Sequence, residues 1–306
     1  MRILLLLGIS MALLLLGQAL LPGFLSATQV ANQLRIAAFL GLFALCQTVV
    51  IAAGGQGLDL SVGAVATLGG VLGAGLLQML GTVGGGVAAL LAGLLVGVLN
   101  GVGIVALRIP PLVTTLAIAS IVDGAVIVGV SVLSPANNAS PALVALAGRA
   151  TLGVPNILFV WALLIAAALW LFTRSAWGVR LCATGASPAV ALLSGTNVRL
   201  VRITAYGISG ALAGLSGYLL TGYVGQAFLG LGNAYVLTSI VAAAIGGVAL
   251  EGGRAPYVAV CCATVMMTVL VSALTAANTG EAGRQIIFGL TLLGFLVADR
   301  VFRRRF

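Results

Sequence analysis

Apolar residues run along this chain in long stretches, separated by short clusters of glycine, proline or polar residues. A stretch of about twenty apolar residues is the length at which an α-helix crosses a bilayer. The stretches are continuous and do not alternate over about ten residues, as transmembrane β-strands do. The pattern predicts an all-α integral membrane protein with about ten transmembrane helices, at 3–25, 32–53, 59–80, 82–107, 112–133, 155–173, 203–223, 235–250, 256–277 and 282–300.

The first stretch, Arg2 followed by "ILLLLGISMALLLLG", has two interpretations. A basic residue followed by an apolar run is typical of a secretory signal peptide. However, the run continues to Leu25 and no small-x-small cleavage site ends it. We therefore interpret it as the first membrane helix.

The arginines favour one orientation of these spans. If both termini are cytoplasmic, the cytoplasmic segments hold Arg2, Arg108, Arg174, Arg180, Arg199, Arg202, Arg254, Arg300, Arg303, Arg304 and Arg305. The opposite side then holds Arg35, Arg149 and Arg284. Basic residues accumulate on the cytoplasmic side of membrane proteins. The sequence therefore predicts a multi-pass membrane protein, embedded in the lipid bilayer with both termini in the cytoplasm.

Composition excludes several classes of function. The chain is 61% hydrophobic and 6% charged, and all 14 basic residues are arginine. A phosphate-binding loop needs lysine, and the lack of histidine removes histidine catalysis and histidine metal sites. The four cysteines have no CxxC spacing and suit buried apolar positions. We expect no metal site and, because arginines beside spans are a topology signal, no nucleic acid partner despite the net charge of +9.

The 43 glycines recur at small-xxx-small spacing, as in "GGVLGAG" and "GGGVAALLAG". Small residues let membrane helices approach closely. The chain is therefore predicted to form one tightly packed polytopic bundle, a single domain over residues 1–306.

The segment "IAAGGQGLDLSVGAV", residues 51–65, places an acid behind a run of glycines between apolar stretches. A charge at the bilayer centre costs about 3 kcal/mol on insertion scales, so we expect a helix break here. Asp59 or Ser61 either caps the helix that begins at the break or contacts a transported solute. Other polar residues in spans either line a path or bond between helices: Gln47, Asn100, Thr114 and Thr115.

A predicted cytoplasmic loop, about 174–202, contains the segment "SPAVALLSG". A helix-capping serine, a proline suited to the first turn and a glycine suited to a left-handed position predict a helix of about two turns. Its residues are Ser187, Pro188, Ala189, Val190, Ala191, Leu192, Leu193, Ser194 and Gly195. A short apolar helix is unstable alone in water, so it either lies on the membrane surface or docks into a groove of a soluble partner.

Four segments together resemble the permease subunit of bacterial ABC importers of the ribose/monosaccharide type. They are "CQTVVIAAGGQGLDLSVGAV", "IPPLVTTLAIASIVDG", "GVRLCATGASPAVALLSGTNVRLVRITAYGISGALAGLSGYL" and "SIVAAAIGGVALEGGR". The chain departs from the family pattern in three places, at the inserted Gln56 and Gly57, at Thr238 and at Asp123. These departures bear on the substrate rather than on the class.

The resemblance implies an ABC importer permease fold in which residues 187–195 form the cytoplasmic coupling helix. It implies a second permease chain, two ABC ATPase domains that use the ATP, and a periplasmic sugar-binding protein. On this interpretation the chain binds no cofactor, is not itself an enzyme, and forms the translocation path for a monosaccharide or similar small polyol. Gln47, Asp59, Ser61, Asn100, Thr114 and Thr115 are then the candidates for that path.

Two other classes remain open from the sequence. An ion-coupled secondary transporter of a small solute needs intramembrane carboxylates or broken-helix ion sites, for which only Asp59 and Asp123 are candidates. An intramembrane enzyme needs a catalytic pair, and no serine or aspartate pair stands out at catalytic spacing.

Overall fold

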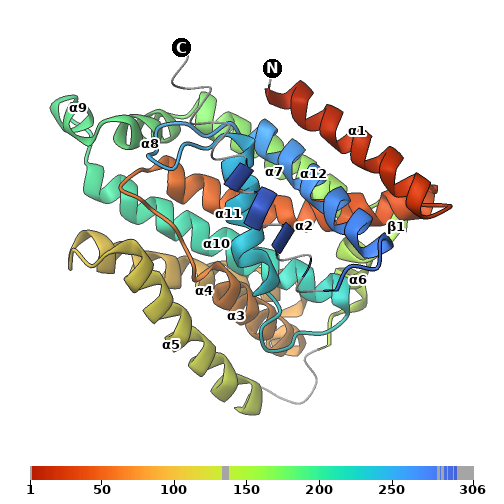
Figure 1. Cartoon of the computed structure of the whole chain (residues 1–306). Helices are drawn as coiled ribbons and strands as arrows, with labels where there is room; N and C mark the ends of the chain where they lie inside the picture. The colour runs from red at the N-terminus through yellow and green to blue at the C-terminus, as the bar shows by residue number, and fades with distance from the viewer. Residues whose placement is uncertain are drawn as a thin grey trace.

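The computed structural model describes residues 2–132, 138–280, 283, 286–287, 289–291 and 293–294. The described chain is mainly helical (Figure 1). The helices are α1 (Arg2–Leu20), α2 (Ala27–Ala52), α3 (Val62–Gly75), α4 (Leu77–Val105), α5 (Pro111–Val132), α6 (Pro141–Ala147), α7 (Ile157–Thr173), α8 (Ala176–Ala186), α9 (Pro188–Leu193), α10 (Val198–Val224), α11 (Ala234–Gly246) and α12 (Tyr257–Ala276). One antiparallel hairpin pairs β1 (Ala150–Thr151) with β2 (Val154–Pro155).

Helices α2 and α10 form the centre of the bundle. Their most apolar windows are 83% and 67% buried, whereas those of α1 and α5 are 17% and 22% buried. In Figure 1, α1 and α5 lie on opposite outer sides of the molecule. Helices hydrophobic all round but mostly uncovered suit a lipid environment, so α1 and α5 present apolar surface to the bilayer.

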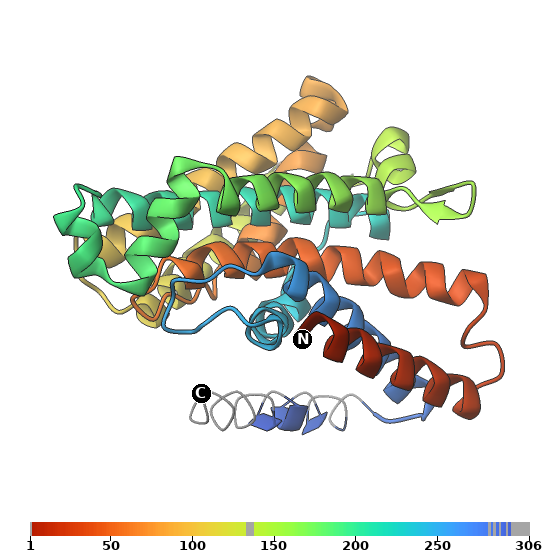
Figure 2. The same ribbon diagram turned by 90° about the horizontal axis from the view of Figure 1, so that it is seen from above.

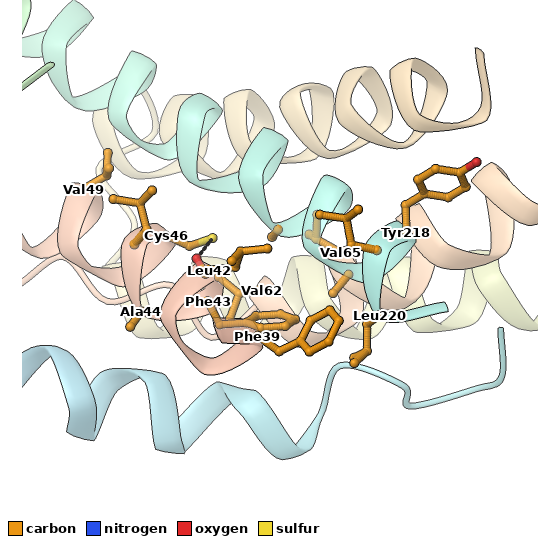
Figure 3. Packing of buried hydrophobic residues seen from close by; sticks show 14 of the residues in the cluster. Phe39, Leu42, Phe43, Ala44, Cys46, Val49, Val62, Val65, Tyr218 and Leu220 are labelled. Carbon is orange, nitrogen blue, oxygen red and sulfur yellow. Dashed lines mark hydrogen bonds between the residues drawn. The ribbon is translucent and has the colours of Figure 1, made fainter. Parts of the chain in front are cut away.

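The core joins side chains of α2 to those of α3 and α10. Figure 3 shows Phe39 and Phe43 of α2 close to Val62 of α3 and Leu220 of α10. The Phe43 ring stacks on Tyr235 of α11, with ring centroids 4.6 Å apart. These contacts hold the central helix against three neighbours, α3, α10 and α11.

Glycines bring α4 and α10 into backbone contact. A Cβ on Gly93 would overlap the carbonyl oxygen of Gly210, and a Cβ on Gly97 would overlap that of Tyr206. The prediction that small-xxx-small spacing lets helices approach closely is therefore confirmed for α4 and α10. Any larger side chain at these positions would push the two helices apart.

The number of spans is only partly settled. Among the described residues, six helices are long and apolar enough to cross a membrane, or seven if α7 and α8, which meet at a 67° bend, form one span. Two further apolar helices, α3 and α11, are shorter. The predicted span at 282–300 lies mostly outside the described residues. The sequence analysis separates two spans at residues 80–82, whereas α3 ends at Gly75 and α4 begins at Leu77; a non-helical backbone at Gly81 (φ 68°) interrupts α4 near the expected boundary.

The loop predicted at 174–202 is more helical than the sequence analysis expected. It contains α8, which was not predicted, and α10 begins at Val198 rather than near residue 203. Ser175 explains the start of α8, because its hydroxyl accepts a hydrogen bond from the amide of Gly178. Helix α6 and the β1–β2 hairpin, in the segment before α7, were not predicted either.

Segments predicted to be cytoplasmic meet at one end of the bundle. The chain after α2 contacts the end of α8 and the loop before α12, since Gly54 lies against Gly185 and Gly252. The side chain of Arg202 lies against Gly55. Figure 2 shows α9 and the loops around it at the end of the molecule away from the β1–β2 hairpin. The predicted alternation of the spans agrees with this grouping, and the side of the membrane that this end faces remains a prediction.

Candidate functional site

The expected helix break lies between α2 and α3. Gly54, Gly55 and Gln56 all have positive φ angles, of 74°, 71° and 56°, so the chain cannot continue as a helix. Helix α3 does not begin until Val62. Asp59 sits inside this break with only 1% of its surface exposed. The carboxylate is therefore buried in protein, as a polar group at membrane depth must be.

The Asp59 carboxylate accepts three hydrogen bonds. Its Oδ1 accepts from the backbone amide of Ser61 at 3.0 Å and from the hydroxyl of Ser61 at 2.6 Å. Its Oδ2 accepts from the hydroxyl of Ser209 on α10 at 3.1 Å. Hydrogen bonds to a charged group contribute about 1.5–3 kcal/mol each, which offsets the cost of burying the acid.

Ser61 is the N-cap residue of α3 by position, but its side chain makes no capping bond. Instead the hydroxyl donates to Asp59 and accepts from the side-chain amide of Asn100 on α4, at 2.8 Å. The carboxylate of Asp59 does not bond the first helical turn beyond Ser61. Both residues therefore connect elements rather than cap a helix in the usual way.

Gln47 holds the backbone of the break. Its Nε2 donates to the carbonyl oxygen of Asp59 at 2.7 Å, and its Oε1 accepts from the Asp59 amide at 3.4 Å. Both bonds join α2 to the same residue, 12 positions later. Gln47 is fully buried, so the two bonds satisfy its amide group within the core.

We call Gln47, Asp59, Ser61, Asn100 and Ser209 the Asp59 network. Four of the six path candidates from the sequence belong to it, and they come from α2, the break and α4. Ser209 was missed. Its signal is weak in the sequence, because it is one small residue in the glycine-rich stretch "GISGALAG".

The other two path candidates lie apart from the Asp59 network. The hydroxyl of Thr114 donates to the carbonyl oxygen of Pro110, just before α5, and that of Thr115 donates to the carbonyl oxygen of Pro111, the first residue of α5. The methyl group of Thr114 lies against Gly103 of α4. Both hydroxyls are therefore bonded locally, apart from the Asp59 network, and their place in a translocation path stays a prediction.

Polar groups of α10 continue from the network towards the break. Arg202, Tyr206 and Ser209 follow one another at spacings of four and three, so they lie on one face of the helix. The hydroxyl of Tyr206, the Nε of Arg202 and the Oδ1 of Asn100 are buried and make no hydrogen bond with the described residues. These atoms give the region capacity for additional polar partners.

A glycine junction lies between the Asp59 network and the predicted coupling helix. It consists of Gly54, Gly185 and Gly253, with Ala52 beside them. A Cβ on Gly185 would overlap the carbonyl oxygen of Ala52 and the amide nitrogen of Gly253. The amide of Gly253 also donates to Ala52 at 3.0 Å. Three backbone segments are therefore in direct contact at Gly185, two residues before Ser187, the N-cap of α9.

The predicted helix at residues 187–195 is confirmed as α9. The Ser187 hydroxyl accepts from the amide of Val190 at 3.4 Å, and Pro188 occupies the first turn. Gly195 follows the helix with φ of 77°. Ala191 is buried, whereas Val190, Leu192 and Leu193 are 61%, 60% and 90% exposed. The helix therefore rests on the protein through Ala191 and presents three large apolar side chains outwards.

Comparison with known proteins gives one family and a set of relatives. Residues 29–296 match the family model described as branched-chain amino acid transport system / permease component. The chain is 30% identical to the ribose import permease protein of Bacillus subtilis (strain 168) over 91% of its own length and 87% of the relative's. It is 28% identical to the fructose import permease protein of Rhizobium meliloti, over 96% and 84%. It is 30% identical to the galactose/methyl galactoside import permease protein of Escherichia coli (strain K12), over 91% and 88%.

No solved structure matches the chain. The sequence relatives agree with the resemblance drawn from the four motifs, which is confirmed. They match nearly the whole chain, so the likeness extends well beyond the motif segments.

Proposed function

The chain belongs to the family of the branched-chain amino acid transport system permease component, and on that premise we propose that it is the membrane permease subunit of an ATP-driven sugar importer. The observation that carries the proposal is its similarity, over about nine-tenths of its length, to import permeases named for ribose, fructose and galactose. The same relatives favour an importer permease over the ion-coupled secondary transporter.

The family description names amino acids, whereas these relatives carry the names of sugars. Each of these sugar permeases matches most of this chain. We therefore propose a monosaccharide or similar small polyol as the substrate. The buried, unbonded polar atoms of Tyr206, Arg202 and Asn100 support this class, because sugar hydroxyls both donate and accept hydrogen bonds. We expect the translocation path to pass this region of the bundle.

We propose ten spans with both termini in the cytoplasm of a bacterial inner membrane. To the six helices that are long and apolar enough to span would be added α7, the shorter helices α3 and α11, and residues 282–300, while α8 stays in the cytoplasmic loop. Residues 1–306 would then form one permease domain. The arginine distribution supports the orientation.

The partners would be a second permease chain, two ABC ATPase domains and a periplasmic sugar-binding protein. ATP would be bound and hydrolysed by the ATPase partner, and this chain would bind no cofactor and catalyse no reaction. Helix α9 supports the ATPase contact, because its exposed side chains Val190, Leu192 and Leu193 form an apolar face that suits a groove on a soluble protein.

The glycine junction would transmit movement of α9 to the Asp59 network. Gly185 lies two residues before Ser187, the first residue of the coupling segment, and it is in backbone contact with Ala52. A displacement of α8 and α9 would therefore press directly on the segment that leads to Asp59. Because the backbones touch directly, no flexible side chain lies between them that could change conformation and take up the displacement.

Uptake measurements in cells test the proposed class. Cells that express the chain with a cognate ABC ATPase and a cognate periplasmic sugar-binding protein should accumulate radiolabelled ribose, fructose or galactose. Arsenate, which depletes ATP, should stop this accumulation, whereas a protonophore given with ATP maintained should not. Uptake that survives ATP depletion but collapses with the ion gradient would instead identify a secondary transporter.

A further inference from the structure

The hairpin of β1 and β2 ends in a turn whose first central residue is unusual. The register pairs Thr151 with Val154, so the turn consists of Leu152 and Gly153. Both have positive φ angles, of 53° and 81°, as the two central residues of a type I′ turn require. Asparagine or aspartate followed by glycine is the usual pair there, because a left-handed backbone crowds larger side chains. Leucine is therefore a residue that the turn itself does not favour.

The side chain of Leu152 projects away from the protein. It is 99% exposed, the largest exposed fraction among the large apolar residues of the described chain. Exposed leucines on the long apolar helices can face lipid, whereas Leu152 lies in a turn. Its backbone conformation costs free energy, and its side chain is buried against nothing in this chain. These two observations together point to a contact outside the fold.

The hairpin stands outside the hydrocarbon core of the membrane. Its sheet has only two strands among the described residues, so the outer edge of each strand carries backbone groups that no other strand pairs. Such backbone does not face lipid in the hydrocarbon region, because nothing there can satisfy its hydrogen bonds. Figure 2 shows the hairpin beyond the start of α7, at the end of the molecule away from α9. Leu152 therefore meets neither the acyl-chain core nor the partner proposed for α9.

Hydrogen bonds hold the hairpin against the bundle. The backbone amide of Asn156 donates to the carbonyl oxygen of Arg149 across the base of the hairpin, at 3.0 Å. The side-chain amide of Asn156 donates to the carbonyl oxygen of Ala145 in α6, at 2.7 Å. Pro155 is buried, and β2 contacts both α2 and α7. A side chain presented from a fixed backbone loses little entropy on binding, so the hairpin suits a docking contact.

The charge around the hairpin is positive. Arg149 lies at its base and is exposed. The segments 27–35, 138–156 and 224–234 contact one another at this end, and all of their residues are described. They hold two arginines, Arg35 and Arg149, and no aspartate or glutamate. A partner surface with acidic groups around an apolar pocket complements both the charge and the leucine.

We propose that the β1–β2 hairpin docks the periplasmic sugar-binding protein, with Leu152 inserted into an apolar pocket of that protein that acidic groups surround. The inference rests on the proposed function, in which the binding protein is the soluble partner on the side of the membrane opposite to the ATPase. It adds the surface of this chain to which the binding protein attaches. The unfavourable turn residue is then explained, because its side chain serves the contact and not the fold.

Affinity for the binding protein tests the inference. The chain is purified in detergent with its cognate ATPase and is titrated with the sugar-binding protein that supports uptake of ribose, fructose or galactose. Leu152→Asn suits the turn better, so this variant should melt no lower than the unaltered protein. It should nevertheless bind the sugar-binding protein about tenfold to a hundredfold more weakly, the fold-change that corresponds to burying a leucine. Leu152→Met keeps an apolar side chain and should bind more tightly than Leu152→Asn.

Two further variants define the surface. Arg149→Gln should weaken binding by up to about fivefold and reduce its dependence on salt, because the arginine lies at the rim of the contact. Leu107→Asn is the matched control. Leu107 is 69% exposed and follows α4, whose Gly101 lies against Ile203 near the start of α10, at the end of the bundle near α9. Its substitution should leave the affinity for the binding protein unchanged.

Four results would overturn the inference. Equal affinities of Leu152→Asn and the unaltered protein would show that the leucine contacts lipid headgroups or nothing. Weaker binding together with a lower melting temperature would give Leu152 a role in the fold. A changed number of permease chains in the Leu152→Asn complex, measured by native mass spectrometry, would assign the hairpin to a contact between copies of this chain. If no sugar-binding protein binds the unaltered protein, the importer assignment fails as well, which separates that case from the other three.

Discussion

The carboxylate of Asp59 accepts a hydrogen bond from the hydroxyl of Ser209, 150 residues later in the chain, at 3.1 Å. This bond joins the break between α2 and α3 to the central helix α10. Both residues are almost fully buried, so bulk solvent does not reach the carboxylate to replace the donor. The bond therefore stabilises the position of the break against α10.

Removing this donor should destabilise the protein. Ser209→Ala leaves Asp59 Oδ2 without its partner and should cost about 1.5–3 kcal/mol, the range for a hydrogen bond to a charged group. Ser216→Ala is the control, because Ser216 is also buried on α10 but bonds only the carbonyl oxygen of Leu212 in its own helix. Thermal melting of the purified proteins in detergent should place Ser209→Ala clearly below Ser216→Ala. Equal melting temperatures would show that the bond to Asp59 contributes nothing to stability.

A side chain at the glycine junction should separate the segments that meet there. Gly185→Ala places a methyl group against the carbonyl oxygen of Ala52 and the amide of Gly253, and overpacking of this kind costs about 1–3 kcal/mol. We expect sugar uptake to fall more than the amount of protein in the membrane. Gly124→Ala serves as the control, since a Cβ there has no neighbour within 4 Å. Normal uptake by Gly185→Ala would remove the junction from the coupling route.

A charge on the exposed face of α9 should disrupt the contact with the ATPase. Leu192→Asp replaces a side chain whose burial is worth roughly 1.5–3 kcal/mol with a carboxylate that would be costly to bury in a groove. The variant permease should reach the membrane in normal amounts. Less ATPase subunit should co-purify with it, and it should transport no sugar. Ser187→Ala should act in the same direction but more weakly, by about 1 kcal/mol of lost capping.

Helix α6 provides the control for α9. It also begins with a capping serine and a proline, Ser140 and Pro141, and it carries the partly exposed Leu146. However, it packs near Gly222, at the other end of α10. Leu146→Asp should therefore leave ATPase recovery unchanged. Full transport by Leu192→Asp would show that α9 is a surface helix, and its loss from the membrane would show that α9 belongs to the folded core.

The orientation of the spans can be measured with reporter fusions. A fusion after Arg149 should report the periplasm and a fusion after Arg202 the cytoplasm, because the arginine distribution favours that arrangement. The structure separates the two sites, with Arg202 beside Gly55 and Arg149 next to the β1–β2 hairpin. Reversed reports would contradict the predicted sidedness but not the fold.

Much of the site was predictable because polar residues are rare in this chain. Gln47, Asp59 and Asn100 stand out in apolar segments, and the glycines before Asp59 indicate a break. Thr114 and Thr115 stand out equally, but threonine can bond the carbonyl oxygen four residues earlier, and both do so. Ser209 could not be chosen from the sequence, because its bond to Asp59 depends on a tertiary contact between distant segments.

The fold shows the same division between local and tertiary information. The caps of α9 depend on neighbouring residues, and the sequence predicts them. The pair Ser140–Pro141 is the same capping signal as Ser187–Pro188. It begins α6, whereas the second pair begins α9, and the two helices lie in different parts of the structure. A capping motif therefore predicts a helix, whereas the exposure of Leu192 and Leu193, which suggests a partner, required the structure.

The most direct test of the importer assignment is ATP hydrolysis in proteoliposomes. The purified chain alone should hydrolyse no ATP above background, because it has no lysine for a phosphate-binding loop. Reconstituted with a cognate ABC ATPase and a cognate sugar-binding protein, the complex should hydrolyse ATP faster when the binding protein carries its sugar, and the sugar should enter the vesicles in step. Sugar entry that proceeds without ATP, or hydrolysis by this chain alone, would contradict the assignment.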